Sequence, residues 1–368
     1  MSTRKDKFSN KDKKYMSVAL SLASARHGLT GENPSVGCVI VKNDEIISIG
    51  QTGYNGRPHA EDNAIKNSIE TLEYSTMYVT LEPCNHYGLT APCTKAIIKN
   101  KISKVIYSVE DVDKKVKGKS FKILKYKNII VKKGLLNKEI NDFYQPYIFN
   151  RKNKMPFVTG KIAVSKNNLI YSKEKKKITD IHSDKFTHFL RYRNDSLMIT
   201  YKTLNEDNPK LNCRLNGLNK FSPQRIILDN KLQTNTSSYV FRTVNKTNTI
   251  IFYNEADRIK VSLFKKKGIK LIKSNLLKNG NFDIKLILKK LYSLGNRNLL
   301  VEGGNDLSKS FIKKRLFNQF YLFKSPKSLS KLVAYKDFNC IIELSHKYKI
   351  KDKINTLLGK DSITLFRN

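Results

Sequence analysis

The sequence predicts an α/β protein with two domains. In both halves of the 368-residue chain, short apolar segments typical of strands alternate with segments of helical periodicity. The chain is longer than one ordinary domain, and its 39% of hydrophobic residues suffices for two cores. Between the halves, Asn150–Pro156 is polar and charged and ends in proline, which is typical of a linker. We therefore expect domains at residues 1–148 and 157–368, joined by a linker at 149–156.

The first domain is expected to begin with a helix and to continue in the order β-β-α-β-α-β. Apolar residues at helical spacing between Met16 and Ala23 predict the first helix, over residues 11–27. The remaining predicted segments are the strands Val36–Val41, Glu45–Gly50, Thr76–Leu81 and Lys104–Val109 and the helices Ala60–Ser68 and Thr94–Asn100. This order brings strand-to-helix junctions to one edge of the sheet, where the sites of α/β domains form.

Three metal-binding side chains stand at such junctions. They are His59, Cys84 and Cys93, and their pattern, His-x-Glu…Pro-Cys…Cys, is the signature of zinc nucleobase deaminases. That signature has Cys-x-x-Cys, whereas eight residues separate the two cysteines here. Catalytic zinc takes three protein ligands and leaves a position for water, which then ionises near neutral pH. We therefore expect these residues to bind one zinc ion and Glu61 to carry protons from water to the departing amine.

Other interpretations of these residues remain open. The cysteines could be ordinary buried thiols, as we expect for Cys38 inside its apolar run. His86 could complete a structural site, which normally has four protein ligands, but it lies only two residues after Cys84. The ligand types favour zinc, although iron or cobalt could occupy such a site in vitro.

The segment Thr80–Cys93 resembles the bifunctional riboflavin-biosynthesis deaminase/reductase family, the RibD family, whose deaminase half has the stretch T-L-E-P-C-x-H-x-G-x-T-P-P-C. Asn33–Val41 and Pro58–Glu61 extend this resemblance over the first domain. The resemblance implies a cytidine-deaminase-like, three-layer α/β domain. It also implies zinc-dependent hydrolytic deamination of a phosphoribosylated diaminopyrimidine, with Asn33 as a candidate for holding the base.

The second half predicts another α/β domain, with a largely parallel sheet. The predicted strands are Phe157–Val164, Ser196–Thr200, Arg225–Leu228, Thr249–Tyr253, Ile269–Lys273 and Asn298–Glu302, and the predicted helices are His182–Tyr192, Phe282–Leu294 and one that begins near Leu307. Gly303 and Gly304 separate the last strand from the last helix. Glycines there permit close approach of phosphate oxygens, and a helix N-terminus attracts anions, although a plain tight turn is the other interpretation.

Val301–Leu307 and Thr203–Arg214 resemble the reductase half of the same family, which is similar to dihydrofolate reductase in fold and uses NADPH. The resemblance implies that this domain reduces the ribosyl unit of the deaminated product to a ribityl chain. It implies cofactor contacts at Ala163, Thr203, Asp207, Gly304, Asn305, Asp306 and Leu307. It implies substrate contacts at Arg191, Leu211, Arg214 and Glu302, where the arginine at 191 suits two-point binding of a phosphate.

The second domain also departs from the family pattern. The family has an Asp-Gly pair where this chain has Asn167 and Asn168, and Lys175 and Lys177 stand where the family has a serine and a tryptophan. Asparagine tolerates left-handed backbone angles, so the turn is compatible with this change, but the aspartate charge is lost. These departures leave an alternative open, in which the deaminase works and the second domain is degenerate and non-catalytic.

The charge of the chain is strongly positive, with a formal net charge of +39. Such a field could attract nucleic acid. Only 13 of the 70 basic residues are arginine, however, and the lysines are spread along the whole chain. Base-reading proteins rely on arginine and on clustered charge. We therefore expect a small-molecule substrate and no specific nucleic-acid partner, and a nucleic-acid base deaminase remains the competing class.

Targeting signals are not expected in this sequence. Residues 1–8 contain no apolar run of the kind that a signal peptide needs, and no run approaches 18 apolar residues. The five cysteines, two of them assigned to zinc, fit a reducing compartment. We expect a cytoplasmic protein with no membrane partner, and the family resemblance implies an assembly of identical chains.

Overall fold

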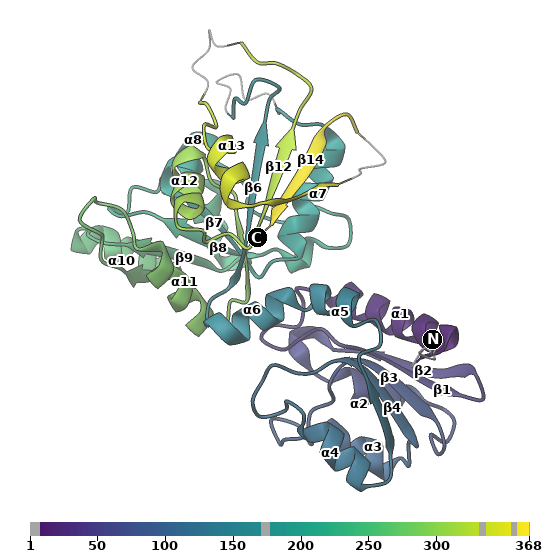
Figure 1. The fold of residues 1–368 in the computed structure, drawn as a ribbon. Coiled ribbons are helices and arrows are strands. Elements are labelled where there is room, and N and C mark those ends of the chain that lie inside the picture. Colours follow the sequence, from purple (N-terminus) through teal and green to yellow (C-terminus); the bar gives the residue numbers. More distant parts are fainter. Residues whose placement is uncertain (1–7, 171–176, 331–335, 355–358, 368) are drawn as a thin grey trace. The chain divides into compact units, whose positions relative to one another are not determined.

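The computed structural model describes residues 8–170, 177–330, 336–354 and 359–367. The chain divides into two compact units, Met1–Lys154 and Met155–Asn368 (Figure 1). The division falls within the predicted linker at 149–156. Most of that linker is not extended, however, because helix α6 spans Gln145–Asn153, with Pro146 in its first turn, where proline is tolerated.

Unit 1 is built on a five-stranded sheet in the order β2-β1-β3-β4-β5. Its strands are β1 (Gly37–Lys42), β2 (Glu45–Gln51), β3 (Thr76–Leu81), β4 (Lys104–Val109) and β5 (Ile130–Lys133). Its helices, besides α6, are α1 (Asn10–Arg26), α2 (Ala60–Asn67), α3 (Cys93–Lys99), α4 (Lys119–Tyr126) and α5 (Asn137–Phe143), and a 3-10 turn covers Tyr54–Gly56. Strand β1 is antiparallel to β2 and β3, whereas β3, β4 and β5 are parallel. Figure 1 shows α1 and α5 on one face of the sheet and α2, α3 and α4 on the other, so the unit has the predicted three layers.

Local sequence explains how α2 is positioned in this unit. A Cβ atom on Gly50 would lie 2.1 Å from the carbonyl oxygen of Ala60, so only glycine allows strand β2 and helix α2 to approach so closely. Ala60 and Ala64 are fully buried against the sheet. The same close contact therefore fixes the start of α2, where His59 and Glu61 stand.

Unit 2 is built on a nine-stranded sheet in the order β10-β9-β8-β7-β11-β6-β12-β14-β13. Its strands are β6 (Phe157–Val164), β7 (Ser196–Thr200), β8 (Gln224–Leu228), β9 (Thr249–Tyr253), β10 (Lys270–Lys273), β11 (Asn298–Val301), β12 (Gln319–Lys324), β13 (Ile350–Ile354) and β14 (Ser362–Arg367). The seven strands from β10 to β12 are parallel, in agreement with the largely parallel sheet that was predicted from the first six of them. Strands β12, β14 and β13 were not predicted from the sequence. Strand β14 is antiparallel to both of its neighbours.

Helices and hydrophobic cores cover both faces of this sheet. The helices are α7 (Ile181–Tyr192), α8 (Tyr201–Asp207), α9 (Tyr239–Arg242), α10 (Arg258–Lys266), α11 (Ile284–Ser293), α12 (Asn305–Lys313) and α13 (Ile341–Lys347), with 3-10 turns at Asn219–Phe221 and Val244–Lys246. Successive residues of β8 point to opposite faces of the sheet. Ile226 packs into the core on one face, and Ile227 packs into the core on the other face. This two-sided burial is typical of parallel sheets. Helix α12 begins at Asn305, two residues before the predicted start. No helix of the described residues is long and apolar enough to cross a membrane.

Candidate functional sites in the two units

The three predicted metal ligands lie together in unit 1. The Nδ1 atom of His59 is 3.2 Å from the Sγ atom of Cys93 and 3.5 Å from that of Cys84, and the two sulfur atoms are 3.4 Å apart. In a tetrahedral zinc site with Zn–S bonds of about 2.3 Å, ligand atoms are separated by about 3.8 Å. The observed spacings therefore fit one zinc ion bound by these three side chains.

Each ligand is positioned by the end of a secondary-structure element. His59 is the N-cap residue of α2, Cys84 follows β3 by three residues, and Cys93 is the first residue of α3. The backbone N–H of Thr94 donates to the carbonyl oxygen of Cys84 at 3.1 Å, which ties the end of the β3 segment to the first turn of α3. In the described part of the chain, the cluster that could hold a metal contains only these three ligands. His86 is not among them, so the site has the open position of a catalytic zinc centre rather than four protein ligands.

The surroundings of Cys84 favour its thiolate form. Hydrogen bonds from the Cys93 thiol and from His59 lower the pKa of the Cys84 thiol well below its usual value, and the backbone N–H of Cys93 also donates to its sulfur, at 3.3 Å. The hydrogen bond to Cys84 raises the pKa of His59. The thiolate is the form of cysteine that binds metal, so the low pKa of Cys84 favours binding of a metal cation by this cluster.

Glu61 is the buried carboxyl group beside these ligands. Its side chain is 4% exposed, in the first turn of α2, and burial raises the pKa of Glu61 to about 7. A group with a pKa near the working pH both accepts and returns a proton readily. Burial and position therefore suit Glu61 for general acid–base catalysis.

Asn33 and Glu82 hold segments around this site. The side-chain amide of Asn33 donates to the carbonyl oxygen of Gly56 at 3.4 Å, so it lies beside the segment that leads to His59. Glu82, which is 3% exposed, accepts backbone N–H groups from Asp111 at 3.3 Å, from Gly118 at 3.0 Å and from Ser120 at 3.2 Å. This role of Glu82 was not predicted, because its signal in the sequence is no more than a glutamate directly after a buried strand.

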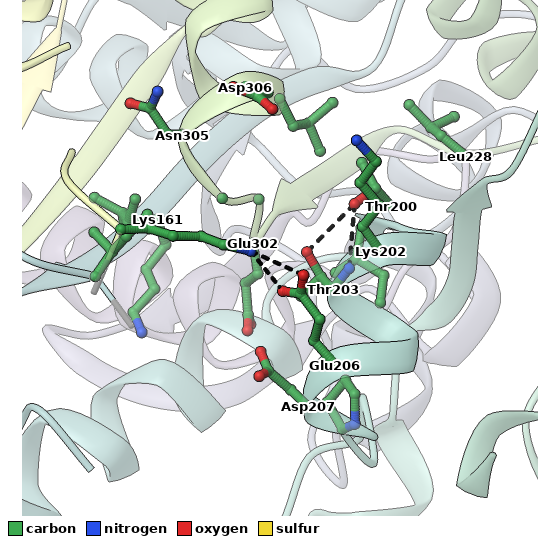
Figure 2. Close-up of a pocket in the computed structure, with 18 of the residues that line it drawn as sticks. Lys161, Thr200, Lys202, Thr203, Glu206, Asp207, Leu228, Glu302, Asn305 and Asp306 are labelled. Carbon is green, nitrogen blue, oxygen red and sulfur yellow. Dashed lines mark hydrogen bonds and ion pairs between the residues drawn. The ribbon is translucent and has the colours of Figure 1, made fainter. Parts of the chain in front are cut away.

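Unit 2 contains a cavity of about 1370 Å³ at the carboxyl ends of its parallel strands (Figure 2). All seven predicted cofactor contacts line it, namely Ala163 on β6, Thr203 and Asp207 on α8, and Gly304, Asn305, Asp306 and Leu307 at the start of α12. Three of the four predicted substrate contacts in this unit also line it, namely Arg191, Leu211 and Glu302. The structure thus brings together residues from four separate segments of the chain.

The Gly303–Gly304 turn fits an extended cofactor with phosphate groups. A Cβ atom on Gly304 would meet no atom within 4 Å, although this residue lines the cavity and is the N-cap of the nine-residue helix α12. Open space, backbone N–H groups and the positive end of a helix favour an anion at this position. The residues present therefore fit NADPH in this cavity.

A buried ion pair stands in the same cavity. Arg191, on α7, donates from Nε and Nη2 to the two carboxylate oxygens of Glu302, each at 2.7 Å. This pairing lowers the pKa of Glu302 against the effect of burial. Lys161, on β6, lies nearby, and burial lowers its pKa. Arg191 and Lys161 thus place two basic side chains beside this carboxylate, where they could contact an anionic group of a substrate.

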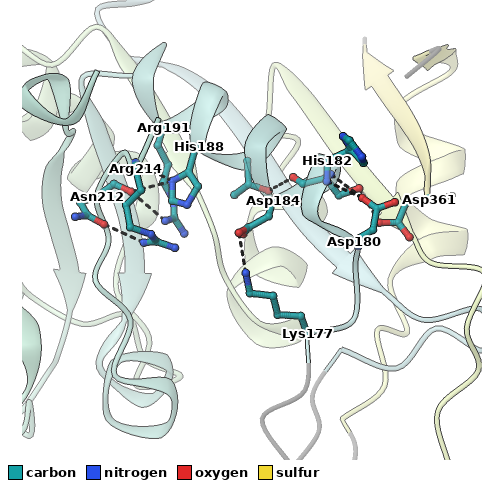
Figure 3. Close-up of polar contacts among 11 residues, drawn as sticks. Lys177, Asp180, His182, Asp184, His188, Arg191, Asn212, Arg214 and Asp361 are labelled. Carbon is teal, nitrogen blue, oxygen red and sulfur yellow. Dashed lines mark hydrogen bonds and ion pairs between the residues drawn. The ribbon is translucent and has the colours of Figure 1, made fainter. Parts of the chain in front are cut away.

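Arg214 lies outside the cavity lining, in contrast to the other predicted substrate contacts. Its side chain is exposed and donates to Asn212 Oδ1 at 3.0 Å, and its backbone N–H is 3.3 Å from Nδ1 of His188 (Figure 3). Figure 3 shows Arg191 close to His188 as well. The cationic neighbours and burial lower the pKa of His188 to about 4, with burial as the larger cause.

Some of the positions that depart from the family pattern lie among the described residues. Asn168 has a φ of 63°, and its backbone N–H donates to the carbonyl oxygen of Ser165 at 3.0 Å, so the turn is retained, as the sequence predicted. Lys177 lines the cavity and pairs with Asp184 at 2.8 Å (Figure 3). Lys175 lies outside the described residues.

Comparisons with known proteins agree with the two sites. A family model described as the cytidine and deoxycytidylate deaminase zinc-binding region matches residues 9–109, and one described as the RibD C-terminal domain matches residues 160–333. The riboflavin biosynthesis protein RibD of Aquifex aeolicus (strain VF5) is 33% identical over 97% of this chain and 98% of its own length. The chain belongs to the RibD family.

Solved structures of the RibD family agree over the whole chain. The structure of Acinetobacter baumannii RibD (form 2) matches with a TM-score of 0.82 and 25% identity, covering 97% of this chain and 98% of that one. A diaminohydroxyphosphoribosylaminopyrimidine deaminase/5-amino-6-(5-phosphoribosylamino)uracil reductase from Thermotoga maritima matches with a TM-score of 0.80 and 27% identity, with the same coverage.

The chain is therefore a bifunctional enzyme of riboflavin biosynthesis, with a zinc-dependent deaminase domain and an NADPH-dependent reductase domain. The predicted pair of folds, cytidine-deaminase-like and reductase, is confirmed. The full-length matches favour this function over the alternative of a deaminase with a degenerate second domain.

Proposed function

We propose that this chain acts on the substrates that the name of the Thermotoga maritima protein states. It first deaminates 2,5-diamino-6-(5-phosphoribosylamino)pyrimidin-4-one, and then reduces the ribosyl unit of the product to a ribityl chain. The observation that carries the proposal is the pairing, in one chain, of a three-ligand metal cluster beside buried Glu61 with a cavity that holds a cationic cluster around Glu302.

The first step is assigned to His59, Glu61, Cys84 and Cys93. When bound by the His and the two Cys, zinc lowers the pKa of a coordinated water to about 7 and so supplies hydroxide at neutral pH. Glu61 accepts one proton of this water and passes it to the ring nitrogen as the oxygen adds to the amine-bearing carbon. It then takes the proton of the newly added hydroxyl group and gives it to the departing amine, which leaves as ammonia while the C=O bond forms. Its burial supports this role, because a carboxyl group with a pKa near 7 exchanges protons in both directions. Asn33 holds the base from the segment before β1.

The second step is assigned to the cavity of unit 2. NADPH, when bound, supplies the hydride that reduces C1′ of the opened ribosyl unit. Thr203 and Asp207 on α8, Ala163 on β6 and the segment Gly304–Leu307 position the cofactor. Arg191, Leu211 and Glu302 contact the substrate, and Arg191 presents a cation for its phosphate. We keep Arg214 as a substrate contact, with an exposed side chain that is not among the residues lining the cavity.

The partners and the compartment of the enzyme complete the proposal. Five free cysteines support a reducing compartment, so we place the enzyme in the cytoplasm. The dispersed lysines support only weak, non-specific attraction to nucleic acid, and we expect neither a membrane partner nor a specific nucleic-acid partner; the enzyme assembles as a homo-oligomer. RNA-binding titrations at physiological salt test this part, and tight binding that weakens steeply with added salt would contradict it.

The experiment that tests both steps follows NADPH absorbance with zinc-loaded protein and the diaminopyrimidine ribosyl phosphate. Wild-type protein is expected to release ammonia and to consume NADPH, whereas Glu61→Ala is expected to do neither from this substrate. The same variant should still consume NADPH when the deaminated substrate is supplied. Ammonia release without NADPH consumption would instead support a deaminase with a degenerate second domain.

A further inference from the structure

Arg57 lies at the deaminase site but has no role in the chemistry described above. It precedes the ligand His59 by two residues, and its charge is felt at that histidine, where it opposes the rise in pKa that the hydrogen bond to Cys84 causes. Its Nη1 atom donates to the Oγ1 atom of Thr90, which stands in the loop between the ligands Cys84 and Cys93. Arg57 therefore joins the two segments that carry the metal ligands, within electrostatic range of the metal site.

Most of the hydrogen-bonding capacity of this guanidinium is unused. In the described part of the chain, the bond to Thr90 is its only side-chain hydrogen bond, and it forms no ion pair. The Nε atom is buried and has no hydrogen-bond partner among the described residues. A buried donor without an acceptor is costly, and a buried charge without a counter-charge is more so. A ligand that accepts hydrogen bonds and carries negative charge would satisfy both needs.

The unused edge of Arg57 is the one that binds oxyanions. Arg191 in unit 2 uses its Nε and Nη2 atoms to hold both oxygens of Glu302, at 2.7 Å each. In Arg57 the same two atoms have no hydrogen-bond partner within the described segments of the chain. Its Nη2 atom is 3.4 Å from the position that a Cβ atom on Gly88 would occupy, and no other atom lies within 4 Å of that position. The absence of a side chain at Gly88 therefore leaves space beside this edge.

A second cation beside the same loop is already engaged. The ammonium group of Lys95 donates to the hydroxyl of Tyr87 and lies 4.7 Å from the centre of its ring. Lys95 is exposed, whereas Arg57 is half-buried. Of these two cations, Arg57 alone combines burial with a free two-point donor edge, which suits a phosphate group.

We propose that Arg57 binds the phosphate group of the deaminase substrate, through Nε and Nη2, and so makes the deaminase specific for the phosphorylated form. This inference rests on the proposed function, because that function supplies a substrate with a phosphate. Arg57 thus acts in specificity, and its hydrogen bond to Thr90 orients the guanidinium.

The test compares ammonia release from the phosphorylated substrate and from the same substrate after phosphatase treatment, with zinc-loaded, full-length protein. Wild-type protein is expected to prefer the phosphorylated form by about a hundredfold in kcat/KM. Arg57→Met should reduce this preference to a few-fold, mainly through a higher KM, with zinc content and kcat close to wild type. Inorganic phosphate should inhibit wild-type protein competitively and the variant much more weakly.

Two further variants separate phosphate binding from a purely structural role. Gly88→Val keeps the charge and fills the space beside Nη2, so it should also reduce the preference. Lys95→Met removes a cation from the same loop and should leave the preference unchanged. Equal losses on both substrates in Arg57→Met, or a reduced preference in Lys95→Met alone, would overturn the inference. Failure of wild-type protein to release ammonia from either substrate would overturn the proposed function itself, and the inference with it.

Discussion

Arg191 and Glu302 stand 111 residues apart in the sequence and form a two-point ion pair in which both N···O distances are 2.7 Å. Their side chains are only 11% and 15% exposed. Helix α7 supplies the arginine and the segment after β11 supplies the glutamate, so this pair links two elements that line the reductase cavity. The pair therefore contributes to the shape of the cavity as well as to its charge.

Removing one member of this pair is expected to destabilise unit 2 strongly. Glu302→Leu leaves a buried guanidinium without its counter-charge, and Arg191→Met leaves a buried carboxylate, so each should lower the free energy of unfolding by about 3–5 kcal/mol. The double variant should lose much less than the sum of the two. Urea denaturation of the four proteins measures this coupling. Additive losses would show that the two side chains do not stabilise each other.

Replacing one zinc ligand is expected to separate the two activities. Cys84→Ser and Cys93→Ser should lose bound zinc and all measurable ammonia release, because a site with three protein ligands cannot spare one. NADPH consumption with the deaminated substrate should persist, since the reductase cavity lies wholly within unit 2. Zinc content is measured by atomic absorption. His86→Asn is the control, because His86 lies outside the metal cluster; loss of zinc in that variant would show that the histidine is a fourth ligand.

The two glycines before α12 are expected to respond differently to substitution. Serine is a favoured N-cap residue and its Cβ atom at position 304 would enter open space, so Gly304→Ser should leave stability within about 0.5 kcal/mol of wild type. The same side chain intrudes on the cavity, so the Kd for NADPH should rise about tenfold. A Cβ atom on Gly303 would lie 2.8 Å from that of Leu307, so Gly303→Ala should cost about 1–3 kcal/mol. Calorimetry and NADPH titration test both, and unchanged NADPH affinity in Gly304→Ser would contradict the assignment.

Acid is expected to destabilise unit 2 through His188. Its pKa is about 4 in the folded protein and about 6.5 when unfolded, so between these values the unfolded chain binds more protons than the folded one. Stability contributed by the neutral histidine is therefore complete above pH 6.5 and is lost as the pH falls toward 4, by at most about 1.4 kcal/mol per pH unit. Urea midpoints between pH 4.5 and 7.5 measure this loss. His188→Asn should show a shallower acid dependence, and an identical slope would exclude this histidine as the cause.

Local patterns predicted much of the fold. The bounds of β3, β4, β6, β7 and β9 coincide with the predicted ones, because each is a short apolar run between turn residues. The ligand cluster was also predictable, because two strand-to-helix junctions of one α/β sheet, β2 to α2 and β3 to α3, carry the three metal-binding residues. The chemistry of this site is therefore encoded in short stretches of sequence.

Other parts depend on pairing over long distances and could not be predicted in the same way. Strand β13 (Ile350–Ile354) carries two lysines and is at most half-buried, so no apolar alternation marks it, and it forms by pairing with β14. The position of Arg214 outside the cavity follows from its contacts with His188 and Asn212. Glu82 binds the segment from Asp111 to Ser120 by accepting hydrogen bonds from its backbone N–H groups. Because every residue except proline has such a group, this contact could not be predicted from the sequence.

The narrow fit between Gly50 and Ala60 makes the position of the metal site depend on a residue that is not one of its ligands. Any side chain at position 50 would force α2 away from β2 and carry His59 and Glu61 with it. A genetic screen for inactive deaminase is therefore expected to recover changes at this glycine beside those at the ligands. Substitutions of Gly50 would leave the side chains of His59 and Glu61 unchanged but would displace both of them together.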